Sequence, residues 1–175
     1  MSKDKLTNRI RPQIPEPEYD NDPKELYAFY GLAAYSAQLL EQGITNLLVG
    51  LRILNLSSPT HGDVTNYFDH ASKKTMGALL NAVRKVTPFD PDIDDELQKA
   101  LIRRNYLIHT FFVEHDKDLL SESGRRQMID ELIEIIKEFK EVDPKVDELW
   151  LSIWKKYGWT EERIEQELMA MKEGL

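Results

Sequence analysis

Apolar side chains recur at alternating spacings of four and three residues in the series Leu26, Tyr30, Ala33, Ala37, Leu40, Ile44, Leu47, Leu51 and Leu54. Such spacing keeps one side chain per turn on a single face, so it predicts one long α-helix. Similar stripes predict helices over residues 63–86, 96–113 and 124–141. Asp143-Pro144 is expected to end the last of these, with further helices beyond it. We therefore expect an all-α fold, an antiparallel bundle of four main helices with additional C-terminal helices.

The same pattern divides the chain into three regions. Residues 1–23 hold four of the eight prolines and little periodic apolar character, which is typical of an irregular, Pro-rich arm. Residues 24–142 contain the four predicted main helices and should form the bundle. Residues 143–175 are expected to form C-terminal helices whose aromatic side chains pack onto that bundle.

Composition narrows the classes of function. A formal net charge of -8 argues against a broad basic surface, because non-specific affinity for nucleic acid comes mainly from Lys and Arg that neutralise phosphates. Any RNA must therefore be held locally. The absence of cysteine excludes disulfides and thiolate metal sites and agrees with a reducing compartment. Neither a signal peptide nor a run of about 18 apolar residues occurs, so we expect a soluble cytoplasmic protein without membrane association.

A polar set interrupts the apolar side of the helix predicted over residues 96–113. Arg104 falls in the middle of the core-facing arc, and Asn105 and His109, one turn apart, fall together at its edge. The core-facing arc carries Leu97, Ala100, Leu101, Leu107, Ile108, Phe111 and Phe112. Beyond the polar pair, a second, smaller apolar arc carries Ile102, Tyr106 and Val113.

Arg104 has several interpretations at this position. An arginine that faces a core must pair with a carboxylate, extend toward solvent or face an anion, because an unpaired buried charge is very costly. In the first case Arg104 pairs with a carboxylate of a neighbouring helix and His109 is a structural histidine. In the last case both residues belong to a cleft that holds an anion.

The order Arg104-Asn105-Tyr106-Leu107-Ile108-His109 resembles the R-x4-6-H signature of HEPN domains, the small all-helical domains of many prokaryotic toxins and defence proteins. The match includes the Asn that often follows the Arg, and the helices predicted around it extend the resemblance over roughly residues 24–142. The resemblance implies a homodimer in which two copies of the motif line one cleft. The sequence allows such a dimer, because the chain's own bundle needs only one of the two apolar arcs.

The resemblance also implies roles for the motif residues in metal-independent RNA cleavage. His109 is the candidate general acid or base, and Arg104 is the candidate phosphate clamp and transition-state stabiliser. Asn105 would orient the histidine or the phosphate.

Three further cations are candidate substrate contacts. Arg103, about 100° from Arg104 on the helix, is placed to make an accessory phosphate contact. Lys73 and Lys74, in the middle of the second predicted helix, either form a solvated face or help hold the RNA backbone.

The predicted function is a metal-independent endoribonuclease of HEPN type, similar to toxins or phage-defence proteins, whose products carry 2′,3′-cyclic phosphate and 5′-hydroxyl ends. An antitoxin or another protein would then be its partner. The alternative is a non-catalytic helical dimer that binds a nucleotide or a protein. No P-loop, GxGxxG, HExxH or GxSxG pattern implies a cofactor or another common enzyme class. No metal site is expected, because an exposed acidic loop accounts for the cluster of His109, Glu114, His115 and Asp116.

Overall fold

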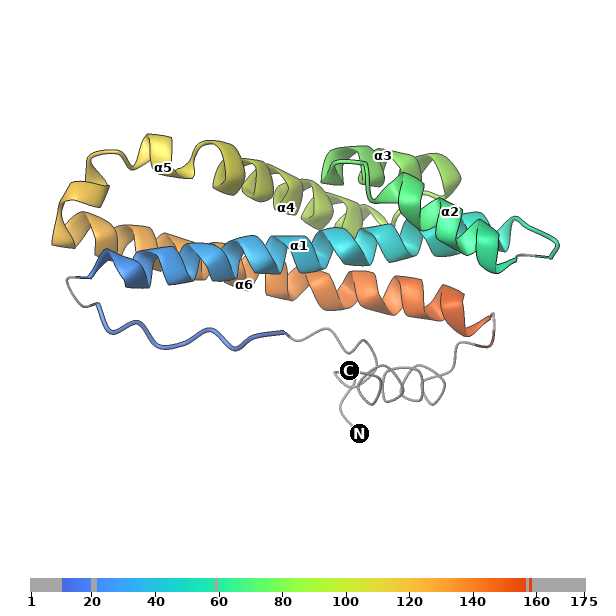
Figure 1. Ribbon diagram of the computed structural model, residues 1–175, viewed down its shortest axis with the longest axis horizontal. Helices are drawn as coiled ribbons and strands as arrows, with labels where there is room; N and C mark the ends of the chain where they lie inside the picture. The colour runs from blue at the N-terminus through green and yellow to red at the C-terminus, as the bar shows by residue number, and fades with distance from the viewer. Residues whose placement is uncertain (1–10, 20–21, 59, 157, 159–175) are drawn as a thin grey trace. The chain divides into compact units, whose positions relative to one another are not determined.

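The computed structural model describes residues 11–19, 22–58, 60–156 and 158 (Figure 1). Within these residues all regular structure is helical and no strand occurs, which confirms the predicted all-α class. No helix in this part of the chain has the length and apolar character needed to cross a membrane. In chain order the elements are α1 (Pro23–Leu54), α2 (His61–Ala71), α3 (Met76–Val86), α4 (Pro91–His109), α5 (Phe111–Glu114), the 3-10 helix η2 (Asp118–Leu120) and α6 (Glu122–Lys155).

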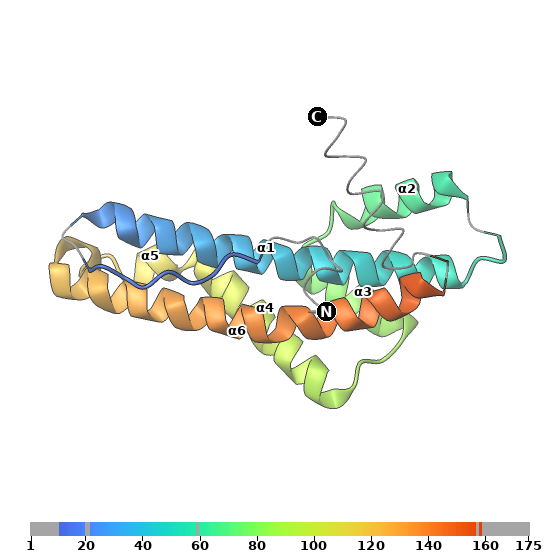
Figure 2. The same ribbon diagram turned by 90° about the horizontal axis from the view of Figure 1, so that it is seen from below.

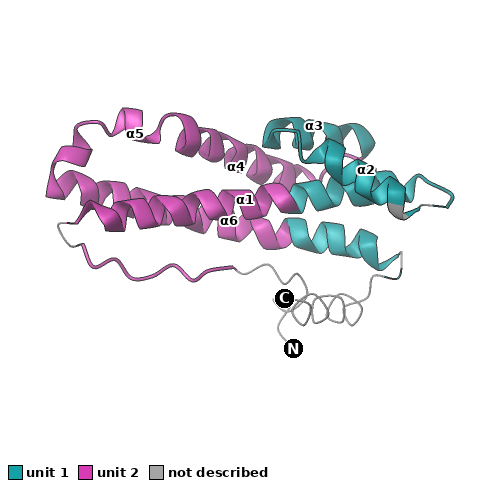
Figure 3. Ribbon diagram, in the orientation of Figure 1, with its two compact units in different colours: residues 1–10, 43–86, 146–175 teal, residues 11–42, 87–145 magenta. Residues whose placement is uncertain are grey.

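The chain forms two compact units (Figure 3). Among the described residues, unit 1 contains 43–86 and 146–158, and unit 2 contains 11–42 and 87–145. The long helices α1 and α6 therefore each contribute one part to each unit. Unit 2 holds all of α4 and α5, and with them the motif residues.

In unit 2, α4 runs antiparallel to the parts of α1 and α6 beside it, as the bundle prediction required. The Tyr30 hydroxyl donates to the Leu107 carbonyl at 3.2 Å, whereas Glu41, further along α1, meets Arg104, which comes earlier in α4. The ion pairs between α4 and α6 show the same antiparallel order. Glu96, early in α4, pairs with Lys145, late in α6, whereas Arg103 pairs with the earlier residue Glu138.

The core of unit 2 is the apolar stripe of α6 packed against α1, α4 and α5. All five predicted core residues of this stripe have no exposed side-chain surface, and burying each stabilises the fold by roughly 1.5–3 kcal/mol. They are Met128, Leu132, Ile135, Ile136 and Phe139. The buried residues that face them include Leu26, Phe29, Ala33, Leu40, Leu97, Ala100, Leu107 and Phe111.

The single helix predicted over residues 63–86 is wrong, because α2 ends at Ala71 and α3 begins at Met76 in unit 1. Ser72 and Thr75 interrupt it with their hydroxyl groups. The Ser72 hydroxyl donates to the Asp69 carbonyl at 3.1 Å, and the Thr75 hydroxyl accepts the Ala78 N–H at 3.3 Å, at the start of α3. Hydroxyl side chains that bond to the nearby backbone favour helix ends over helix interiors.

The predicted break at Asp143-Pro144 is also wrong, because α6 continues through Pro144. Proline costs a helix one hydrogen bond, but the turns on both sides of it bury apolar side chains, among them Val142 and Val146. Beyond it, the last part of α6 packs in unit 1, where the Trp154 indole donates to the Asn46 carbonyl at 3.2 Å. The helix predicted after residue 159 lies outside the described residues.

Residues 11–19 form no helix and run alongside α6 in unit 2 (Figures 1 and 2). The Arg11 Nε atom lies 2.7 Å from Oδ2 of the buried Asp143, and the Lys140 ammonium donates to the Pro12 carbonyl at 2.6 Å. This arm thus has direct polar contacts to the helix that carries the core stripe.

Candidate functional site

The motif helix begins and ends at well-defined residues. Asp90 caps it by accepting the Asp92 N–H at 3.0 Å, and Pro91 occupies the first turn. The helix predicted over residues 96–113 is interrupted at Thr110, whose N–H and hydroxyl both donate to the Tyr106 carbonyl, at 2.9 and 3.1 Å. The N–H contact continues the helical pattern, whereas the hydroxyl competes for the same carbonyl, and α4 ends here with His109 as its last residue.

Arg104 is half-buried and is paired within its own chain. Its Nη2 atom lies 3.6 Å from the Glu41 carboxylate of α1, and its Nη1 donates to the Asn105 side-chain oxygen at 3.3 Å. Only 22% of the Arg104 side chain is exposed. Of the arrangements open from the sequence, the structure therefore shows pairing with a neighbouring helix, with the guanidinium at the edge of the core.

His109 and Asn105 lie on an exposed surface that we call the outer face, formed by Ile102, Asn105, Ile108, His109 and Val113. The apolar members are unusually open to solvent, with exposed fractions of 61% for Ile102, 41% for Ile108 and 73% for Val113. Ile108 was predicted in the core-facing arc, and its exposure corrects that assignment. His109 makes no hydrogen bond or ion pair with any described residue, so its ring nitrogens are open to an outside partner.

Arg103 faces α6 instead of the outer face. It donates to both Glu138 oxygens, with Nε–Oε2 at 2.9 Å and Nη2–Oε1 at 3.1 Å. This hydrogen bonding raises the pKa of Arg103 against the opposing effect of burial. The predicted phosphate contact would have to compete with this carboxylate, and it stays a prediction.

A groove of about 670 Å³ lies between α4 and α6 beside Arg103. Its charged lining is three carboxylates against two cations, which makes it a poor channel for a phosphate backbone. These charged residues are Glu96, Glu138, Glu141, Lys99 and Arg103.

Lys73 and Lys74 lie in unit 1, in the turn between α2 and α3, whereas the motif residues lie in unit 2. Lys73 is exposed and Lys74 half-buried. Their contact with an RNA backbone stays a prediction.

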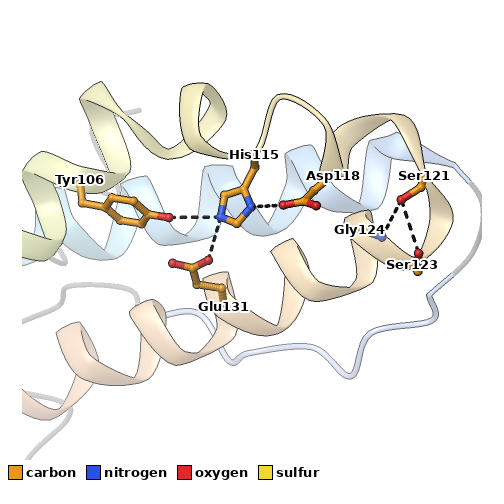
Figure 4. A network of polar contacts seen from close by, with 7 residues as sticks. All are labelled: Tyr106, His115, Asp118, Ser121, Ser123, Gly124 and Glu131. Carbon is orange, nitrogen blue, oxygen red and sulfur yellow. Dashed lines mark hydrogen bonds and ion pairs between the residues drawn. The ribbon is translucent and has the colours of Figure 1, made fainter.

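A second polar cluster, which we call the His115 hub, joins four elements of unit 2 (Figure 4). The His115 Nδ1 atom lies 2.7 Å from Oδ2 of Asp118 in η2, and its Nε2 lies 2.9 Å from Oε2 of Glu131 in α6. The Tyr106 hydroxyl of α4 is 3.2 Å from the same Nε2 atom. Gly124 permits this arrangement, because a Cβ there would overlap the backbone carbonyl of Asp118.

The hub favours a protonated imidazole. Burial of His115 opposes the charge, but its hydrogen bonds to Asp118 and Glu131 outweigh burial and raise the pKa of His115. Burial and a hydrogen bond to Glu131 likewise raise the pKa of Tyr106, so its hydroxyl stays a donor. When protonated, the ring has two N–H groups that can each donate to a carboxylate.

Sequence reasoning did not identify the hub. The three-residue spacing of His115 and Asp118 is visible in the sequence. Glu131 and Tyr106, in contrast, reach the same ring only through the packing of α4 on α6. Among the described residues, no group of three or more His, Asp or Glu side chains is arranged to hold a metal ion.

No family model, curated protein or solved structure matches the chain. The resemblance to HEPN domains therefore rests on the motif residues, their spacing and the order of the helices around them.

Proposed function

We propose that this protein is a metal-independent endoribonuclease of HEPN type, acting at a site formed by two copies of the chain. The observation that carries the proposal is the exposed, unpartnered imidazole of His109 on the outer face. Asn105, one helical turn before it, contacts the half-buried guanidinium of Arg104. A proton-transfer group and an anion-binding group thus occur on one short segment of α4.

The chemistry requires three contributions from the protein. A base removes the proton of the 2′-hydroxyl, whose oxygen attacks the phosphorus, and an acid protonates the 5′-oxygen as its bond to phosphorus breaks. A cation stabilises the charge on the phosphate oxygens. One motif supplies one histidine and one arginine, so two copies would supply both proton-transfer groups. The products would carry 2′,3′-cyclic phosphate and 5′-hydroxyl ends.

The outer face supports the pairing of two copies. Its three exposed apolar side chains come from the same stretch of α4 and α5 as the polar residues Asn105 and His109, and exposed apolar side chains beside a polar site are typical of interaction surfaces. A two-fold axis near His109 would cover these side chains and bring the two histidines together.

Cleavage of RNA in EDTA by purified protein tests the proposal. His109→Ala should lower the rate on the order of a hundredfold to ten-thousandfold, the usual contribution of a general acid or base. His70→Ala is the matched control, since His70 is an exposed histidine of α2 in unit 1. Cleavage by His109→Ala at the wild-type rate would remove the assignment.

Oligomeric state supplies a second test. Val113→Asp changes a side chain that is 73% exposed, so the fold should tolerate it, but the charge should prevent a second copy from docking. We expect a dimer for the wild type and a monomer without cleavage for the variant, measured by light scattering and RNA cleavage. A monomeric wild type that still cleaves RNA would contradict the shared site.

A second candidate is a non-catalytic dimer that binds a nucleotide or a protein. The observation that favours it is charge compensation, because Arg103 and Arg104 both meet carboxylates of their own chain and the net charge is -8. Calorimetric titration with ATP or GTP, together with intact RNA after incubation, would support this candidate. Both candidate functions are compatible with a protein partner, such as an antitoxin.

A further inference from the structure

The His115 hub lies close to His109 along the chain and contacts the residues on both sides of it. Tyr106, three residues before His109, reaches the hub with its hydroxyl. Phe111, two residues after His109, is fully buried, and its ring centroid lies 4.9 Å from that of His115. His109 itself makes no hydrogen bond or ion pair with a described residue, so its place depends on how these neighbours hold the end of α4.

We propose that His115 is a positioning residue: its ring, held between Asp118 and Glu131, fixes the end of α4 and thereby the placement of His109. The inference rests on the proposed function for its catalytic consequence. The link is mechanical, since Tyr106 and the ring of Phe111 are attached to opposite sides of the Thr110 interruption. On the α1 side the Tyr30 hydroxyl already holds the Leu107 carbonyl of this turn, and the hub adds the link to η2 and α6.

The charge state of the hub makes the positioning depend on pH. His115 faces Tyr106 from α4, Asp118 from η2 and Glu131 from α6. Glu114 and Arg103 act on Tyr106, where Glu114 raises and Arg103 lowers the pKa of its hydroxyl. Because the two carboxylates raise the pKa of His115, the hub should be intact while the ring is protonated and should loosen as pH rises through that raised pKa.

The first experiment measures positioning without any substrate. In the full chain with isotope-labelled histidine, NMR should show the His109 ring signals shifted or broadened in His115→Gln and in Tyr106→Phe, and unchanged in His70→Gln. Tyr106→Phe keeps the ring that packs on Phe111, so it serves if His115→Gln does not fold. Folded variants whose His109 signals coincide with those of the wild type would overturn the proposal.

The second experiment measures cleavage. His115→Gln should lower kcat on the order of a hundredfold with little change in KM, because an ångström of displacement of a reacting group costs about that much. The part of the alkaline fall in wild-type activity that follows the titration of His115 should also be absent in the variant, whereas the part due to the general acid should remain. If His115→Gln instead lowers the activity by the same factor at every pH, the role of His115 is purely structural and the proposal is overturned.

The two experiments separate the two proposals. NMR changes at His109 together with a wild type that cuts no RNA would contradict the ribonuclease and leave the positioning intact. If cleavage depends on His109 but the His109 signals do not change in His115→Gln, the ribonuclease proposal stands and the positioning proposal is contradicted.

Discussion

His109 and His115 lie six residues apart and occupy opposite environments. His109 ends α4 on the outer face and has no partner among the described residues, whereas both ring nitrogens of His115 face carboxylates at 2.7 and 2.9 Å. The ring nitrogens of His109 are therefore open to a partner outside the described residues, whereas both ring nitrogens of His115 already have partners within the fold. Each feature makes the ring suited to one task, proton transfer at the surface or support from within.

The largest difference should be in stability. His115→Ala leaves Asp118 and Glu131 facing each other without the cation that joined them, and should lower the free energy of unfolding by about 3 kcal/mol. His109→Ala removes no contact and should change it by less than about 0.5 kcal/mol. Urea unfolding of both variants measures this. Equal losses would mean that the two histidines are not divided between support and chemistry.

The next effect concerns the backbone beneath the hub. Gly124→Ala introduces a methyl group that overlaps the Asp118 carbonyl, and should lower stability by about 2 kcal/mol as η2 is displaced. Gly31→Ala is the matched control, because a methyl group there meets nothing within 4 Å and should be neutral or stabilising by up to about 1 kcal/mol. Thermal unfolding of the pair distinguishes close packing from helix propensity.

A smaller effect is the pH dependence of stability. The folded protein holds His115 protonated to higher pH than an unfolded chain does. The contribution of the hub should therefore be complete below the ordinary histidine pKa and be lost as pH rises through the raised pKa. Urea unfolding at a series of pH values should show this loss in the wild type but not in His115→Gln. The same slope in both proteins would assign it to another group.

The smallest effect should come from Arg103. About 40% of both side chains in its pair with Glu138 is exposed, so solvent screens the interaction. Arg103→Lys keeps the charge but loses the second hydrogen bond, and should cost about 0.5 kcal/mol. If RNA cleavage nevertheless falls tenfold or more, Arg103 leaves Glu138 to contact substrate. If cleavage is unchanged, Arg103 serves only as the structural partner of Glu138.

The fold was predictable to the extent that it depends on apolar periodicity. The α1 stripe and the buried α6 stripe follow from spacing alone. The breaks did not, because Ser72, Thr75 and Thr110 act through hydroxyl contacts to the backbone, and Pro144 is retained by packing on both sides. In each case a local preference competes with tertiary contacts that the sequence does not display.

The candidate site divides in the same way. Spacing placed Asn105 and His109 together and placed Arg104 in the middle of the core-facing arc, but it could not name Glu41 as the partner of Arg104. It also assigned Ile108 to the core-facing arc, whereas 41% of this residue is exposed. The hub needed the approach of α4 to Glu131, a contact between residues far apart in the chain.

The extended arm bears on how this chain can be shortened. A truncation starting at the first helix would remove Arg11, whose Nε atom contacts the buried Asp143 directly before Pro144. Asp143 would lose this cation within α6, next to the one residue of that helix that cannot donate a backbone hydrogen bond. Shortened versions intended for crystallisation or binding assays should therefore keep residues 11–19.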